Sequence, residues 1–175
     1  MVKKVLAFAV VIAVLLGCAV AGAFAWQNEK MQEADRLYGP FIMDAYGVYL
    51  NLKEYMQGDD DAQLAMSTAE TYLNVFMKSA DMLKYANGDH SDADWYIDFK
   101  AALDVAYIKF QPVSDCIASG EQISDSDQDF LSALYSAFDG MQNALRNQDG
   151  SLKWELLKNG YIVETIKAFT AAITG

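Results

Sequence analysis

The single histidine of the sequence limits the metal chemistry that this chain could perform. His90 stands close to four carboxylates, Asp89, Asp92, Asp94 and Asp98, which together could hold a divalent cation weakly. Sites that need two imidazoles, such as the zinc-binding H-E-x-x-H helix, are excluded. Acidic and polar residues just before an apolar pattern are also typical of a helix N-cap. We therefore interpret this group as a solvated loop and cap, and expect neither a resident metal nor a cofactor.

The other acidic segments do not complete a catalytic or ion-binding motif. Segment 125–129, Asp-Ser-Asp-Gln-Asp, resembles the start of an EF-hand loop, but Phe130 replaces the glycine at position six and Ser136 the glutamate at position twelve. Neither a G-x-S-x-G turn nor a glycine-rich phosphate loop occurs. No pair stands out among the 24 acidic residues as the acid and base of a glycosidase. The sequence therefore predicts that the protein is not an enzyme.

Aromatic residues are the remaining candidates for a binding site. The chain has ten tyrosines, nine phenylalanines and three tryptophans, and we expect most of them to fill a hydrophobic core. Tyrosine also offers a broad apolar face with a polar tip, which suits a ligand pocket or a partner surface. The candidate binding residues are Tyr38, Tyr46, Tyr49, Tyr72 and Trp95.

An apolar run at the N-terminus predicts a membrane segment. Residues 5–26 contain no charged side chain and follow Lys3 and Lys4. About 20 apolar residues suffice for a helix to cross a bilayer, and lysines before the run favour a cytoplasmic N-terminus. We therefore expect a cytoplasmic tail over residues 1–4, a signal anchor over 5–26 that binds the lipid bilayer, and an extracytoplasmic domain over 27–175.

Two other interpretations of this run remain open. Ala23-Phe24-Ala25 fits a signal-peptidase site, and cleavage after Ala25 would release a secreted protein. Residues 15–18, Leu-Leu-Gly-Cys, resemble a bacterial lipobox, in which Cys18 would carry the lipid. Leucine before the glycine is unusual in that motif. Each interpretation predicts a different mature protein.

Charge and cysteine content restrict the partners of the domain. The formal net charge is −11, and a negative field of this size repels nucleic-acid phosphates. We therefore expect no nucleic-acid partner. The second cysteine, Cys116, is expected to be a small core residue beside Ile117, with an intermolecular disulfide as the alternative.

The pattern of apolar residues predicts an all-α fold. Apolar positions recur at helical spacing, whereas the alternation typical of strands is absent. Breaks are expected at 58–61, 87–91, 119–124 and 147–150. A kink or a short break is expected at Gly39–Pro40, a kink or the start of a new turn at Pro112, and a bend at Asn159–Gly160. The prediction is a transmembrane helix followed by an antiparallel up-and-down bundle of about four to five helices.

Two classes of function agree with these features. The first is a non-enzymatic interaction protein, an accessory subunit that presents its bundle to a protein partner at the outer face of the membrane. The second is a module that binds a small molecule or a lipid in an aromatic pocket between helices.

Overall fold

The computed structural model describes the backbone of residues 2–58, 61–86, 94–158 and 160–175, and the side chains of these ranges except residues 2–15 and 84–86. The elements are α1 (Val2–Gln57), α2 (Ala62–Ala86), α3 (Asp94–Ala118), α4 (Asp125–Leu145), the 3-10 turn η1 (Trp154–Leu157) and α5 (Tyr161–Thr174). Within these ranges no strand forms, and the only β-type pairing is one bridge between Arg146 and Leu152. The expected all-α class and helical bundle are confirmed.

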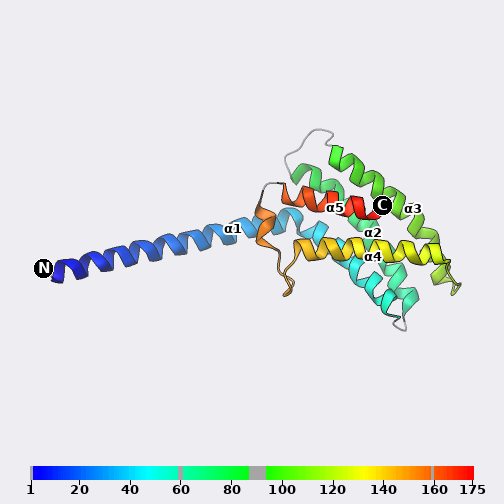
Figure 1. Ribbon diagram of the computed structural model, residues 1–175, viewed down its shortest axis with the longest axis horizontal. Coiled ribbons are helices and arrows are strands. Elements are labelled where there is room, and N and C mark those ends of the chain that lie inside the picture. Colours follow the sequence, from blue (N-terminus) through cyan, green and yellow to red (C-terminus); the bar gives the residue numbers. More distant parts are fainter. Residues whose placement is uncertain (1, 59–60, 87–93, 159) are drawn as a thin grey trace.

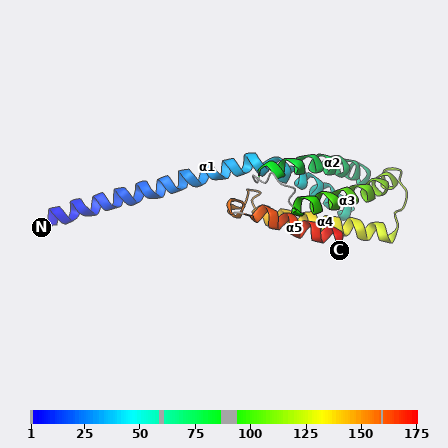
Figure 2. The same ribbon diagram turned by 90° about the horizontal axis from the view of Figure 1, so that it is seen from above.

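The helices form a closed ring in which each helix packs against two others. α1 contacts α2 and α4, α2 contacts α3, and α5 contacts both α3 and α4. α5 therefore lies between two helices that are consecutive in the chain (Figure 1). All five described helices alternate in direction along the chain, so α5 runs antiparallel to α4 and parallel to its other neighbour, α3 (Figures 1 and 2). The connection after α4 stays at the end of the bundle where α4 finishes, and α5 starts from that same end (Figure 1).

A kink or a short break was expected at Gly39–Pro40; α1 is continuous from Val2 to Gln57 with Pro40 inside it, so the helix does not break there. The helix changes direction where it enters the bundle (Figure 1). Proline removes one backbone hydrogen bond and bends a helix without ending it. Phe41 and Ile42, which follow directly, are fully buried and hold this part of the helix against the bundle.

The N-terminal part of α1 extends far beyond the bundle (Figures 1 and 2). Apolar side chains here are exposed, including Leu16 (61%) and Phe24 (68%). In the part of the chain that the structure describes, no helix combines the length and the apolar character needed to cross a membrane. Much of the expected segment, residues 5–15, has side chains outside that description.

Five phenylalanines, one from each helix, form the centre of the core. Phe41 stacks on Phe76 with ring centroids 4.7 Å apart, and Phe138 meets Phe169 edge-on at 4.9 Å. Phe76 also contacts Phe99 at 6.1 Å. All five rings are buried. Because every helix contributes one ring, the cluster packs all five helices against one another. This part of the molecule fits the expectation that aromatic residues mainly build the core.

The N-terminus of α4 begins as expected at Ser124. Its hydroxyl accepts the Asp127 backbone N–H at 3.2 Å, and the Asp127 carboxylate reaches back to the Ser124 N–H, which completes a capping box. The carboxylate at the third position of the apparent EF-hand loop therefore has a structural role.

α3 agrees with expectation and the fifth helix differs from it in part. α3 continues through Pro112 to Ala118 as one helix, as expected for a helix that runs on past its proline. The fifth helix does not begin at Ser151: residues 151–160 contain η1, and α5 starts at Tyr161 after Gly160, whose φ is +79°. Glycine tolerates this left-handed conformation, so the chain can turn sharply there. The expectations for Asp59–Asp60, Asn87–Gly88 and His90 fall outside the described residues.

Candidate functional site

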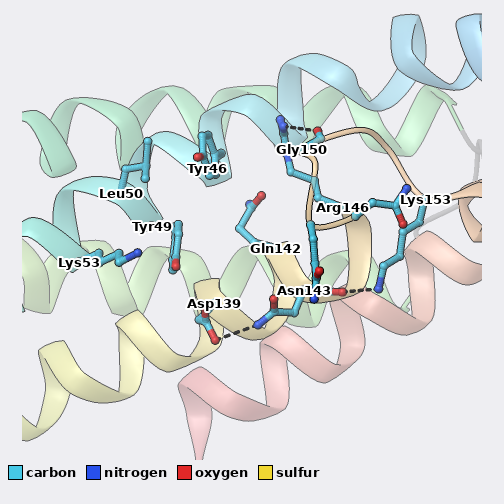
Figure 3. Close-up of a pocket in the computed structure, with 12 residues that line it drawn as sticks. Tyr46, Tyr49, Leu50, Lys53, Asp139, Gln142, Asn143, Arg146, Gly150 and Lys153 are labelled. Carbon is cyan, nitrogen blue, oxygen red and sulfur yellow. Dashed lines mark hydrogen bonds between the residues drawn. The ribbon is translucent and has the colours of Figure 1, made fainter.

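A polar pocket lies between α1, α4 and the connection that follows α4 (Figure 3). Its volume is about 510 Å³, within the usual range for small-molecule sites. One wall is formed by four residues of α1, which are Tyr46, Tyr49, Leu50 and Lys53. The opposite side is formed by Asp139, Gln142, Asn143, Arg146, Asn147, Gln148, Gly150 and Lys153.

Two tyrosines on one face of α1 give the pocket its aromatic wall. Tyr46 and Tyr49 are three residues apart, so their rings project from the same side of the helix, and they stack at 6.0 Å. Tyr135 of α4 stacks on Tyr49 at 5.7 Å, nearly parallel to it. The Lys53 ammonium lies 5.8 Å from the centre of the Tyr49 ring. The stack thereby joins α1 to α4 beside the cavity.

Burial raises the pKa of two of these phenols. It raises the pKa of the Tyr49 hydroxyl, against a smaller opposing effect of hydrogen bonding with Tyr135, and the Asp139 carboxylate raises that pKa further. Burial likewise raises the pKa of Tyr135, with Tyr49 adding to the effect. A phenol is protonated at neutral pH even at its ordinary pKa, so both groups can donate hydrogen bonds.

Gln142 is the unusual residue of the pocket. Only 6% of it is exposed, and neither its amide nitrogen nor its amide oxygen has a hydrogen-bond partner among the described residues. Figure 3 places its amide in the space between Tyr46, Tyr49 and Arg146. Leaving a buried polar group unpaired costs about 1–3 kcal/mol, and native proteins rarely do so. The amide therefore marks a position that a ligand or water can occupy.

Arg146 is held in place while part of its guanidinium stays unpaired. Its carbon Cζ lies 4.8 Å from the centre of the Tyr46 ring, and Nη1 donates to the Gly150 carbonyl at 2.9 Å. Nη2 contacts the Met43 sulfur at 2.7 Å, a weak acceptor. Nε is buried without a partner among the described residues. Nε and Nη2 share the edge that carboxylates bind side-on.

Positive charge gathers at this pocket although the chain as a whole is acidic. Lys53, Arg146 and Lys153 line it, against one carboxylate, Asp139. None of the ion pairs between described residues includes these three cations. Asp139 accepts a hydrogen bond from the Asn143 amide at 2.9 Å, which occupies part of its capacity. The pocket is therefore a local site of attraction for an anion.

The five aromatic residues singled out in the sequence do not form one site. Tyr46 and Tyr49 line the pocket together. Tyr72 of α2 lies against the backbone of Gly47, on another side of α1. Trp95 of α3 packs on the core and meets Tyr96 edge-on at 5.8 Å. Tyr38 is partly buried against the core and lines a separate groove beside η1.

The sequence contained one signal for the residues that were missed. Gln142 follows Phe138 by four residues and precedes Leu145 by three, so it falls on the apolar stripe of α4. A polar residue at such a position needs a partner. The presence of Lys53 and Lys153 at one pocket had no sequence signal, because it depends on how α1 and the connection after α4 are placed relative to each other.

The other candidates have limited roles in the described structure. Cys18 is exposed and Cys116 is partly buried, and these two form no disulfide. Cys116 is therefore not the core residue that was expected, because its sulfur lies near Glu121 and Gln122 in the turn after α3. Among the described residues, no group of three or more histidine, cysteine or carboxylate side chains is placed to hold a metal ion.

Comparison of the chain with protein-family models, with curated proteins and with solved structures finds no match.

Proposed function

We propose that this protein is a membrane-anchored binding module whose extracytoplasmic bundle holds a small molecule between α1 and α4. The observation that carries the proposal is the Gln142 amide, which is buried at the pocket with both of its polar atoms unpaired. A protein that needed this position only for packing would be more stable with an apolar side chain there. A bound molecule that pairs with the amide gives a reason to keep glutamine.

The anchor is supported by the apolar run over residues 5–26 and by Lys3 and Lys4 before it. The exposed apolar side chains on the projecting part of α1, which include Val20 and Phe24, agree with a segment whose surroundings are apolar. Cleavage after Ala25 or lipidation at Cys18 would change the attachment of the bundle and leave the pocket intact.

Binding without catalysis is the simpler interpretation of the pocket. Its described lining contains no histidine, cysteine or serine, and its one carboxylate, Asp139, is engaged by Asn143. The described lining therefore lacks a nucleophile–base pair of the serine–histidine or cysteine–histidine kind. Amides, phenols and cations instead suit recognition of a polar ligand.

A direct test is to purify the full chain in mild detergent and identify small molecules released on denaturation by mass spectrometry. Wild-type protein is expected to release one compound in a stoichiometric amount, whereas the Gln142→Met variant releases much less. The matched control is Gln128→Met, which changes an exposed glutamine of the same helix. Equal amounts from all three proteins, or none from the wild type, would contradict the proposal.

A second candidate function, as an accessory subunit that binds a protein, is favoured by an exposed stripe on α3. Ile97, Val105 and Ile108 are apolar, exposed and spaced to share one face, with 67% of Val105 and 69% of Ile108 accessible. Replacing Val105 and Ile108 by aspartate is expected to leave the helix content unchanged. Loss of a stoichiometric protein partner in the double variant would support this candidate, and purification of the wild type without such a partner would exclude it.

A further inference from the structure

Three cationic side chains from two parts of the chain line the pocket at different points of its wall (Figure 3). Lys53 comes from the end of α1, while Arg146 and Lys153 flank the turn that follows α4. Lys153 donates to the backbone carbonyl of Asn143, which fixes its ammonium at this wall (Figure 3). Since no carboxylate forms an ion pair with these cations among the described residues, the site lacks a built-in counter-charge. An anionic ligand would supply it.

The unpaired atoms restrict the anion further. The Nε–Nη2 edge of Arg146 has the planar arrangement that matches a carboxylate; its Nε is unpaired, whereas its Nη2 contacts the Met43 sulfur, a much weaker acceptor than a carboxylate oxygen. The Gln142 amide has one unpaired donor and one unpaired acceptor. A carboxylate can accept from the amide nitrogen, but only a hydroxyl or amino group on the ligand can donate to the amide oxygen.

We propose that the pocket binds a small organic carboxylate that also carries a hydrogen-bond donor, such as a hydroxy acid. This inference rests on the proposed function and names its ligand class. The carboxylate lies among Lys53, Arg146 and Lys153, and the donor pairs with the Gln142 oxygen. The face of Tyr46 or Tyr49 covers the carbon skeleton.

A free molecule fits this site better than a lipid headgroup. Tyr46 follows Trp26, the end of the proposed anchor, by twenty residues, which corresponds to a helical rise of about 30 Å. The headgroup of a lipid in the bilayer would therefore have to leave the membrane surface to reach the pocket. The ligand is accordingly expected to arrive from solution.

The test measures binding by calorimetry to the full chain in phosphatidylcholine nanodiscs. The probes are lactate, malate and mandelate, each compared with its amide and with the amine that replaces the carboxylate. At least one acid is expected to bind about tenfold more tightly than its amide, and the amine is expected not to bind. Lys53→Gln should weaken binding of the acid by about tenfold. The control Lys78→Gln, at an exposed position of α2, should have no effect.

Several results would overturn the ligand class. If an amide or amine binds as tightly as its acid, or if no acid binds, the carboxylate is excluded. Stronger binding of inorganic phosphate, or loss of acid binding in nanodiscs that contain phosphatidylglycerol, would assign the site to phosphate or to a lipid headgroup. Equal weakening by Lys53→Gln and Lys78→Gln would mean that binding is a non-specific charge effect. These results would not by themselves overturn the proposed function. If the denatured wild type releases a compound that Gln142→Met does not release, the pocket still binds a small molecule, of another class.

Discussion

Replacing Gln142 by methionine should make the ligand-free protein more stable. The two side chains have similar length and similar helix propensity, so the change mainly removes the two unpaired polar atoms. Each unpaired buried group costs about 1–3 kcal/mol, and water in the pocket recovers part of this cost. We therefore expect a gain of about 1–3 kcal/mol in the free energy of unfolding, together with loss of ligand binding.

Thermal unfolding of the full chain in detergent, followed by circular dichroism, measures this gain. For a chain of this length, each kcal/mol shifts the midpoint by about 2–4 °C. The control Gln128→Met, at an exposed position of α4, should stay within about 0.5 kcal/mol of wild type. A loss of stability in Gln142→Met larger than about 1 kcal/mol would refute the reasoning, because the amide would then be well paired in the free protein.

Three further predictions test the packing of the bundle, each by the same unfolding measurement. Gly47→Ala should destabilise the protein by about 1–2 kcal/mol, because a Cβ there collides with the Tyr72 ring. Gly140→Ala meets no neighbouring atom and should stabilise α4 by about 0.5–1 kcal/mol. A stability change of the same sign in both variants would contradict the contact between Gly47 and Tyr72. Phe76→Ala should cost about 3–5 kcal/mol, since this ring touches the four other phenylalanines of the core, and a loss below about 1 kcal/mol would mean that the cluster is not central. Ser124→Ala should cost about 1 kcal/mol through loss of the capping box, and an unchanged stability would count against that cap.

Local signals were sufficient to predict most of the helices, except the start of α5. Apolar spacing identified the segments, and Ser124 with Asp127 identified the start of α4. Proline was the weaker signal: Pro40 and Pro112 both lie inside helices, because burial of neighbouring side chains offsets the one lost hydrogen bond. The position of α5 between α3 and α4 had no local signal, since it depends on where the connection after α4 leads the chain.

The binding site could be predicted only in part for the same reason. Tyr46 and Tyr49 share one helical face, so their proximity follows from spacing alone. The contribution of Arg146 and Lys153 depends on the turn after α4, which is closed by hydrogen bonds such as that from Arg146 to Gly150. Tyr72 and Trp95 belong to other faces of the ring of helices, and sequence spacing cannot relate side chains on different helices.

The central claim is that a small molecule occupies the pocket and pairs with the Gln142 amide. A crystal structure of the full chain, purified in mild detergent without denaturation, tests this through the electron density beside that amide. We expect density larger than a water molecule, with ligand atoms within hydrogen-bond distance of both the amide nitrogen and oxygen of Gln142. Density for water alone, or an amide paired with other residues of the protein, would contradict the account.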